Sequence, residues 1–102
     1  MILKDTFVHH VHFWLNDKAD SAKFINGLQT LAAIKSIRDI HTGVPAATHG
    51  GPVDNSHDAS LLILFNSKAD HDAYDVDPVH QDFIAQYAKL CSKVVVQDSV
   101  NG

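Results

Sequence analysis

Histidine is the residue type in this 102-residue chain whose number and placement point to chemistry. Eight histidines are present, and three of them, His9, His10 and His12, fall between Phe7 and Phe13. An imidazole exchanges a proton near neutral pH and binds transition metals, so these side chains are the first candidates for a functional site.

His80 is the leading candidate for a general base. It follows Asp77-Pro78, where an acidic N-cap and a proline at the first helical position predict a helix start. It shares one stripe of that helix with Phe83 and Tyr87, so its imidazole is expected to face the core. Burial beside a helix N-terminus favours the neutral imidazole that a base needs. The alternative is a core histidine whose two ring nitrogens bond to backbone groups.

Two further side chains are expected near His80. Tyr74 precedes it by six residues, and its hydroxyl could bond to a carbonyl or phenol oxygen; the alternative is a tyrosine at the rim of the core. His9 is the polar member of the otherwise apolar, helix-facing side of the first strand. Two histidines converging on one apolar cavity would make a small-molecule site.

The other histidines and the single cysteine are expected to have structural roles. His10 and His12 share the opposite strand face, where two such pairs could bind a transition metal across a dimer, but polar interface packing is preferred. The remaining histidines are expected at the surface: His41, His49, His57 and His71. Cys91 is expected as a small core residue. No metal and no cofactor is predicted, because no zinc signature, phosphate-binding glycine loop or nucleophile motif is present.

The hydrophobic pattern predicts the elements that must position these residues. The predicted strands are Phe7–Leu15, Ser36–Val44, Ser60–Asn66 and Val94–Asp98. The predicted helices begin at Asp20 or Ser21, at Ser67 and at Asp77, the last reaching Cys91, and residues 45–59 form a long loop. The first helix is expected to bury Phe24, Ile25, Leu28, Leu31 and Ala32. This β-α-β-β-α-β order predicts a ferredoxin-like α+β fold with a four-stranded antiparallel sheet, in one domain over residues 1–102.

Composition and charge exclude several classes of partner. Eight Lys and Arg against twelve Asp and Glu give a net charge of -4, which offers no basic surface for nucleic acid. No apolar stretch approaches the ~20 residues of a membrane span. Cys91 is the single cysteine and fits a reducing compartment. We therefore expect a soluble, cytoplasmic protein that binds neither nucleic acid nor membranes.

Both faces of the predicted strands are apolar, which points to self-association. The strand around Leu61–Phe65 and the run Val94–Val96 have no polar face. Two helices can cover one face only, and a solvated second face should alternate apolar and polar residues. A homodimer with its sheets stacked face to face is therefore predicted.

The chain resembles the stress-responsive α/β barrel (Dabb) family from about Phe7 to Ser99. The segments that carry the resemblance are Val8-His9-His10-Val11, Gly43-Val44-Pro45, Asp58-Ala59-Ser60-Leu61, Tyr74–His80 and Val94–Ser99. It implies a protomer that dimerises into an α+β barrel, with a pocket between sheet and helices. In a polyketide cyclase of the family, the histidine matching His80 is the base, the tyrosine matching Tyr74 assists, and the histidine matching His9 lies nearby, without a cofactor. Many relatives have a histidine where this chain has Asp77.

The resulting expectation is a homodimer that binds a small, partly apolar carbonyl or phenolic ligand. If the protein is an enzyme, His80 would remove a proton next to a carbonyl and Tyr74 would stabilise the enolate, as in an aldol or cyclase reaction. The alternatives are a non-catalytic, stress-related binding module and, by analogy of fold, a cofactor-free monooxygenase. An open cavity of roughly 300 Å³ or more would favour ligand chemistry. Filling of that space by Phe24, Leu28 and Phe83 would favour a structural role.

Overall fold

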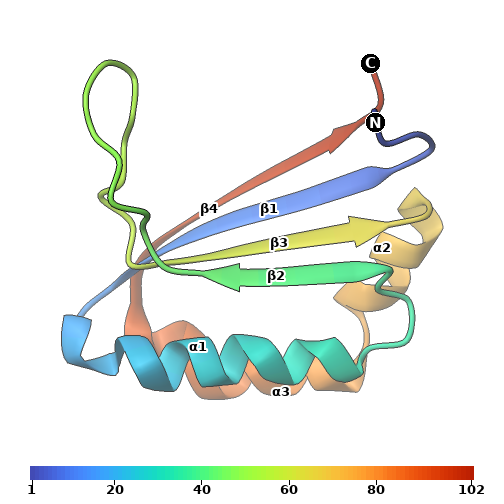
Figure 1. The fold of residues 1–102 in the computed structure, drawn as a ribbon. Coiled ribbons are helices and arrows are strands. Elements are labelled where there is room, and N and C mark those ends of the chain that lie inside the picture. The colour runs from blue at the N-terminus through green and yellow to red at the C-terminus, as the bar shows by residue number, and fades with distance from the viewer.

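A four-stranded antiparallel sheet carries all of the helices on one of its faces in the computed structural model, which describes residues 1–102 (Figure 1). The elements are β1 (Phe7–Leu15), α1 (Ser21–Gln29), β2 (Asp39–Gly43), β3 (Ala59–Phe65), α2 (Lys68–Asp75), α3 (Pro78–Tyr87) and β4 (Cys91–Val100). The strand order is β2-β3-β1-β4, with every neighbouring pair antiparallel. The predicted ferredoxin-like fold is confirmed. No helix is both long and apolar enough to cross a membrane.

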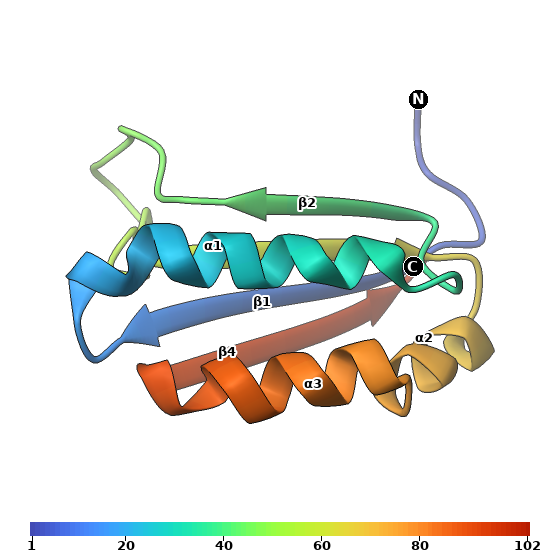
Figure 2. The same ribbon diagram turned by 90° about the horizontal axis from the view of Figure 1, so that it is seen from below.

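Alternation along the two central strands builds the core. In β1 every second residue from Phe7 to Leu15 is buried, and His9 is one of them. The same alternation runs through β3, where Leu61, Ile63 and Phe65 are buried. Because successive strand residues point to opposite faces, these side chains form one apolar layer beneath the helices. As Figure 2 shows, α1 and α3 lie side by side across this layer.

Side-chain caps begin the two helices that flank the cavity described below. The Ser67 hydroxyl accepts a hydrogen bond from the Asp70 backbone N–H at the start of α2. The Asp77 carboxylate accepts one from the Val79 N–H, and Pro78 occupies the first turn of α3. Each cap satisfies a backbone donor that the helix itself cannot. Both predicted helix starts are confirmed.

The boundaries of four predicted elements are wrong, and the strand predicted over Val94–Asp98 runs instead from Cys91 to Val100. α3 ends at Tyr87 and a 3-10 turn, Ala88–Leu90, follows, so Cys91 begins β4 instead of closing the helix. It pairs there with Leu15, across a register shift between Trp14 and Leu15. β2 is limited to Asp39–Gly43. α1 ends at Gln29 in a 3-10 turn, Thr30–Ala33, whose tighter winding leaves the predicted core residue Ala32 exposed.

Close packing explains the glycine inside α1. A Cβ atom at Gly27 would lie 2.6 Å from Cζ of Tyr87, whose ring rests on the helix at that point. That ring is held from behind by Phe83, with the ring centroids 5.3 Å apart and stacked. The glycine therefore sets how closely α1 and α3 approach.

Gly27→Ala is expected to lower the free energy of unfolding by up to about 2 kcal/mol, because an overpacking cost of about 1–3 kcal/mol is offset by a gain of ~1 kcal/mol in helix propensity. Urea denaturation followed by circular dichroism measures the change. Asn26→Ala, at an exposed position of the same helix, is the matched control and is expected to cause no loss. A more stable Gly27→Ala protein would show that the Tyr87 ring moves aside freely.

No helix covers the second face of the sheet, and the loop between β2 and β3 rises on that side (Figure 1). The half-buried apolar side chains on this uncovered face are Val8, Trp14, Leu62, Leu64 and Val95. Trp14 packs between the loop and β4: its indole N–H donates to the Ser56 hydroxyl at 3.1 Å, and the Lys93 ammonium lies 4.7 Å from its ring centroid. The face is therefore a mixture of apolar side chains with histidines and a few charges.

Candidate functional site

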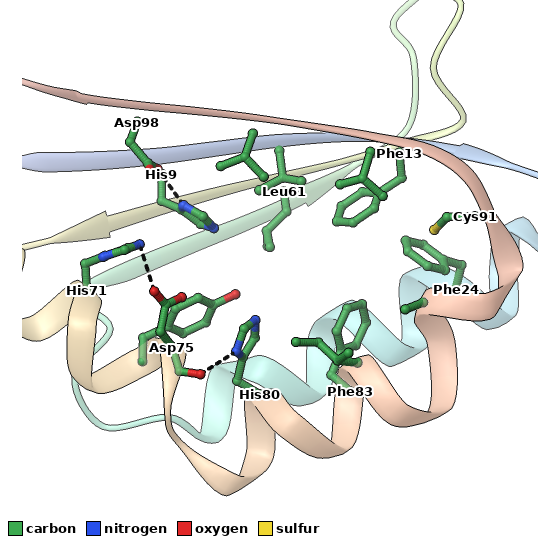
Figure 3. A pocket seen from close by; sticks show the side chains of 16 residues that line it. His9, Phe13, Phe24, Leu61, His71, Asp75, His80, Phe83, Cys91 and Asp98 are labelled. Carbon is green, nitrogen blue, oxygen red and sulfur yellow. Dashed lines mark hydrogen bonds and ion pairs between the residues drawn. The ribbon is translucent and has the colours of Figure 1, made fainter.

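A cavity of about 380 Å³ lies between the sheet and α3 (Figure 3). One end is apolar and is lined by Val11, Phe13, Phe24, Leu61, Phe83, Ile84, Ala88, Cys91, Val94 and Val96. The other end is polar and is lined by His9, His71, Tyr74, Asp75, His80 and Asp98. Phe24 and Phe83 form walls of the cavity without filling it, so the space that a purely structural role would close remains open.

His80 lies at the start of α3 with one ring nitrogen fixed. Its Nδ1 is 3.1 Å from the backbone carbonyl oxygen of Asp75. A carbonyl can only accept, so Nδ1 carries the proton in the neutral ring and Nε2 keeps a free lone pair. In Figure 3 this second nitrogen points into the cavity. The Asp75 carbonyl also accepts a hydrogen bond from the Gln81 amide at 2.7 Å. The loop between α2 and α3 thus selects the tautomer that can act as a base.

Tyr74 is buried beneath the polar end, where only 2% of its surface is exposed. Its ring centroid is 4.4 Å from that of His80 and 5.6 Å from that of His9. Burial raises the pKa of the Tyr74 phenol far above its usual range, and the negative charges of Asp75 and Asp98 raise it further. The phenol is therefore neutral at every physiological pH and can donate a hydrogen bond.

His9 forms a close pair with Asp98. The two residues are directly opposite in the antiparallel β1–β4 ladder, and His9 Nδ1 is 2.6 Å from Asp98 Oδ1. Because a carboxylate only accepts, Nδ1 donates and the Nε2 atom of His9 is left free beside the cavity. The imidazole is 9% exposed and the carboxylate 38% exposed. Asp98 was not among the predicted site residues, since only the β1–β4 register brings it to His9.

The prediction of surface positions is wrong for two histidines. The His71 side chain is only 12% exposed, stacks on Phe7 with ring centroids 4.6 Å apart, and lines the cavity. It lies one helical turn before Tyr74, so i, i+3 spacing was the signal that could have found it. His57 is also buried, with its ring centroid 4.7 Å from that of His12 on the uncovered face. His41 and His49 are exposed as predicted.

The apolar end is built from stacked aromatic rings. The Phe24 ring lies 4.8 Å from Phe13 and 5.8 Å from Phe83, measured between centroids, in edge-to-face arrangements. Cys91 lines this end, and burial raises the pKa of its thiol, so the thiol remains protonated and weakly nucleophilic. This end can hold an alkyl chain or an aromatic ring, but it has no group that could react with either.

The three candidate side chains predicted from the sequence, His9, Tyr74 and His80, thus all line one cavity. The arrangement provides two imidazole acceptor nitrogens and one neutral phenol donor beside an apolar chamber. His10 and His12 lie on the other face of β1, with ring centroids 4.4 Å apart. They belong to neither of the two side-chain groups whose potential metal-ligand atoms converge.

Comparisons with known proteins identify a family match and several solved structures with the same fold. A sequence model described as the stress-responsive A/B barrel domain (Dabb) matches residues 7–101. A Dabb family protein with a ferredoxin-like fold from Mesorhizobium loti superposes with a TM-score of 0.78 at 18% identity, over 95% of this chain and 97% of that chain. A dimeric ferredoxin-like protein of unknown function from Thermobifida fusca gives 0.76 at 21% identity, over 94% and 91%. A hydroxynitrile lyase from Passiflora edulis gives 0.74 at 18% identity, over 95% and 94%. No curated protein gives a significant match.

Proposed function

The chain belongs to the stress-responsive A/B barrel domain family, and from this premise we propose that it is a homodimer whose cavity binds a small, partly apolar carbonyl or phenolic compound and transfers protons on it. The observation that carries the proposal is the free Nε2 lone pair of His80, which faces a chamber that also receives the neutral Tyr74 phenol. A base and a donor at the same end of an apolar cavity are what proton abstraction next to a carbonyl requires.

The proposed chemistry follows from these two groups. A ligand whose carbonyl oxygen accepts the Tyr74 hydroxyl would place its α-carbon against His80 Nε2. His80 takes the α-proton as the C–H bond breaks, and the electron pair moves onto the carbonyl oxygen to give an enolate. The Tyr74 hydrogen bond stabilises the charge that develops on that oxygen. Return of the proton, or attack of the enolate carbon on a second carbonyl in an aldol step, completes the reaction.

The residues around the polar end of the cavity support the assignment of His80 as the base and Tyr74 as the hydrogen-bond donor. The Asp75 carbonyl orients His80, while Asp98 orients His9 on the opposite wall of the cavity (Figure 3). No Lys or Arg lines the cavity, and the N–H groups of His9 and His80 are held by Asp98 and Asp75, so the Tyr74 phenol is the donor available to an oxyanion. The likeness to a hydroxynitrile lyase shows that the fold also carries a lyase elsewhere, which supports an enzymatic role by analogy only.

The proposal is tested by proton exchange, which does not require knowledge of the natural substrate. The protein is incubated in D₂O with a panel of alkyl-aryl ketones and β-diketones, and loss of the α-proton is followed by NMR. At least one compound of the panel is expected to exchange its α-proton faster with the protein than in buffer alone or with heat-denatured protein. Absence of exchange together with absence of binding across the panel would reject the assigned ligand class.

Tyr74→Phe is expected to slow this exchange by ~10²-fold, the scale seen when one oxyanion donor is removed. The substitution keeps the buried ring and its contacts with His9 and His80, so the fold is expected to persist. Initial exchange rates for both proteins, together with thermal melting curves, make the measurement. Unchanged exchange in a folded Tyr74→Phe protein would remove Tyr74 from the mechanism.

The homodimer in this proposal rests on the uncovered sheet face. Leu62, Leu64 and Val95 on that face are only partly buried in a single protomer, and a bare apolar sheet face is unusual for a monomer. Similar structures from Thermobifida fusca and Bacteroides fragilis are described as dimeric. Stacking two such faces would bury these side chains. Sedimentation velocity at micromolar concentration provides the test, and a monomer under those conditions would contradict it.

A further inference from the structure

Four potential metal ligands gather at the polar end of the cavity. Ligand atoms of His9, His71 and Asp98 all lie within 4.8 Å of one another. A carboxylate oxygen of Asp75 lies 3.8 Å from His71 Nε2. The group comes from three separate elements, β1, β4 and α2, which the fold brings together at one point (Figure 3). Two imidazoles with carboxylates form a ligand set suited to divalent transition metals.

His71 is oriented as metal-binding histidines usually are. Its Nδ1 lies 3.1 Å from the Asp72 carboxylate and donates to it, which leaves Nε2 deprotonated in the neutral ring. Nε2 has no hydrogen-bond partner, since the Asp75 oxygen at 3.8 Å is too far away. The ring is held in place by its stacking on Phe7. A free lone pair on a fixed, mostly buried imidazole is thus directed toward His9 and Asp98.

Charge around this point also favours a cation. Asp75 and Asp98 line the cavity, and no Lys or Arg accompanies them there. The Asp72 carboxylate, behind His71, makes an ion pair with Lys68 at 2.8 Å and is thereby neutralised. The polar end is therefore negative overall, and a divalent ion would balance the two carboxylates that face the cavity.

We propose that His9, His71 and Asp98 bind one divalent transition metal ion, of the Zn²⁺ or Co²⁺ type, with its open coordination positions facing the cavity. The ion takes the place of the His9 Nδ1 proton in the contact with Asp98, and that proton moves to Nε2 of the neutral ring. Ligand atoms on one ion are roughly 3–4 Å apart for bonds of ~2.1 Å, so the three side chains need only small adjustments. This site is independent of the proposed proton transfer, which uses His80 and Tyr74.

The test is a titration of the full chain after treatment with EDTA and removal of the chelator. Zn²⁺ is titrated by calorimetry, and Co²⁺ by its visible absorption, which reports nitrogen and oxygen ligation directly. One equivalent per chain is expected. His71→Ala is expected to weaken binding by 100-fold or more, and Asp72→Asn by 10- to 100-fold because it only orients His71. His49→Ala, in the exposed loop, is the matched control and should bind as the unaltered chain does.

Further variants separate this site from the others. His12→Ala removes an imidazole from the uncovered face, and His80→Ala removes the proposed base; both are expected to keep full affinity. Loss of binding in His12→Ala with retention in His71→Ala would overturn the proposal, as would the absence of stoichiometric binding. Asp72 is exposed, so its variant folds even if His71→Ala does not. Proton exchange is measured separately in the metal-free protein, where it tests the roles of His80 and Tyr74 alone. Failure of that assay and failure of the metal titration can therefore be told apart.

Discussion

His80→Ala is expected to abolish proton transfer on any ligand that the cavity accepts. A positioned general base contributes ~10²–10⁴-fold to a rate, and the other free imidazole nitrogen, His9 Nε2, belongs to the opposite wall of the cavity, away from the α-carbon that lies against His80. The α-proton exchange assay in D₂O measures the loss for the panel compounds that the unaltered protein exchanges.

Stability provides the control for this substitution. The His80 ring contributes one hydrogen bond to the Asp75 carbonyl and a contact with Tyr74, and Gln81 continues to satisfy that carbonyl. The melting temperature is therefore expected to change little. His49→Ala serves as the matched histidine substitution and should exchange at the unaltered rate. Exchange near the unaltered rate in a folded His80→Ala protein would show that another group is the base.

Acidification from pH 7.5 to 5.5 is expected to weaken the proposed dimer on the order of 100-fold, because its interface contains histidines that resist protonation. Burial lowers the pKa of His10 from its ordinary value of 6.5, and His57 and His41 nearby lower it further, as does His9 behind the strand. Burial likewise lowers the pKa of His12, helped by His10 and His57, while Asp54 opposes the change.

The sign follows from linkage. A histidine whose pKa is lowered by burial binds fewer protons in the buried state than in the exposed one, so stability is lost as the pH falls through and below 6.5. Stacking a second sheet on this face removes more water from both rings and strengthens the effect. The other titratable groups on the face are His41, His57, Asp39, Asp54 and Lys93. Only two of these groups are acidic and Lys93 is cationic, so the carboxylates do not outnumber the positive charges once His10 and His12 are protonated.

Sedimentation equilibrium at several pH values measures the dimer dissociation constant. The variant His10→Gln/His12→Gln keeps polar side chains of similar size but cannot be protonated, and its dissociation constant is expected to vary much less with pH. Equal pH dependence in the variant and the unaltered chain would show that these two histidines are not responsible. A dissociation constant that stays flat down to pH 5.5 in the unaltered chain would contradict the prediction itself.

Local patterns were enough to predict the elements and half of the polar cavity wall. Alternation placed His9 on the helix-facing side of β1, and helical spacing placed His80 on the inner face of α3, so their convergence followed once the fold was known. Asp98 required the β1–β4 register, which depends on a bulge near Trp14 that no periodicity signals. His71 was hidden in a helix so polar that its single buried residue, Tyr74, gave little indication of an inner face.

The wrong boundary at the end of α3 also results from contacts between residues that are distant in the sequence. The stripe of apolar residues continues through Leu90 and Cys91 without a break, so the pattern predicts one long helix. The chain instead turns there, because the Asn16 N–H donates to the Leu90 carbonyl at 2.8 Å and Cys91 pairs with Leu15. Contacts with residues distant in the sequence decide the boundary, and single-sequence periodicity does not contain them. The roles of His9, Tyr74 and His80 in chemistry remain predictions that the experiments above address.

The position of Trp14 gives this protein an intrinsic optical reporter. It is the single tryptophan of the chain, and it lies half-exposed on the uncovered face between Ser56 and Lys93. Its fluorescence therefore depends on how much water reaches that surface, and emission should shift to the blue when a second sheet excludes it. Dilution or acid titrations can consequently be followed without a dye, in the same cuvette that reports unfolding.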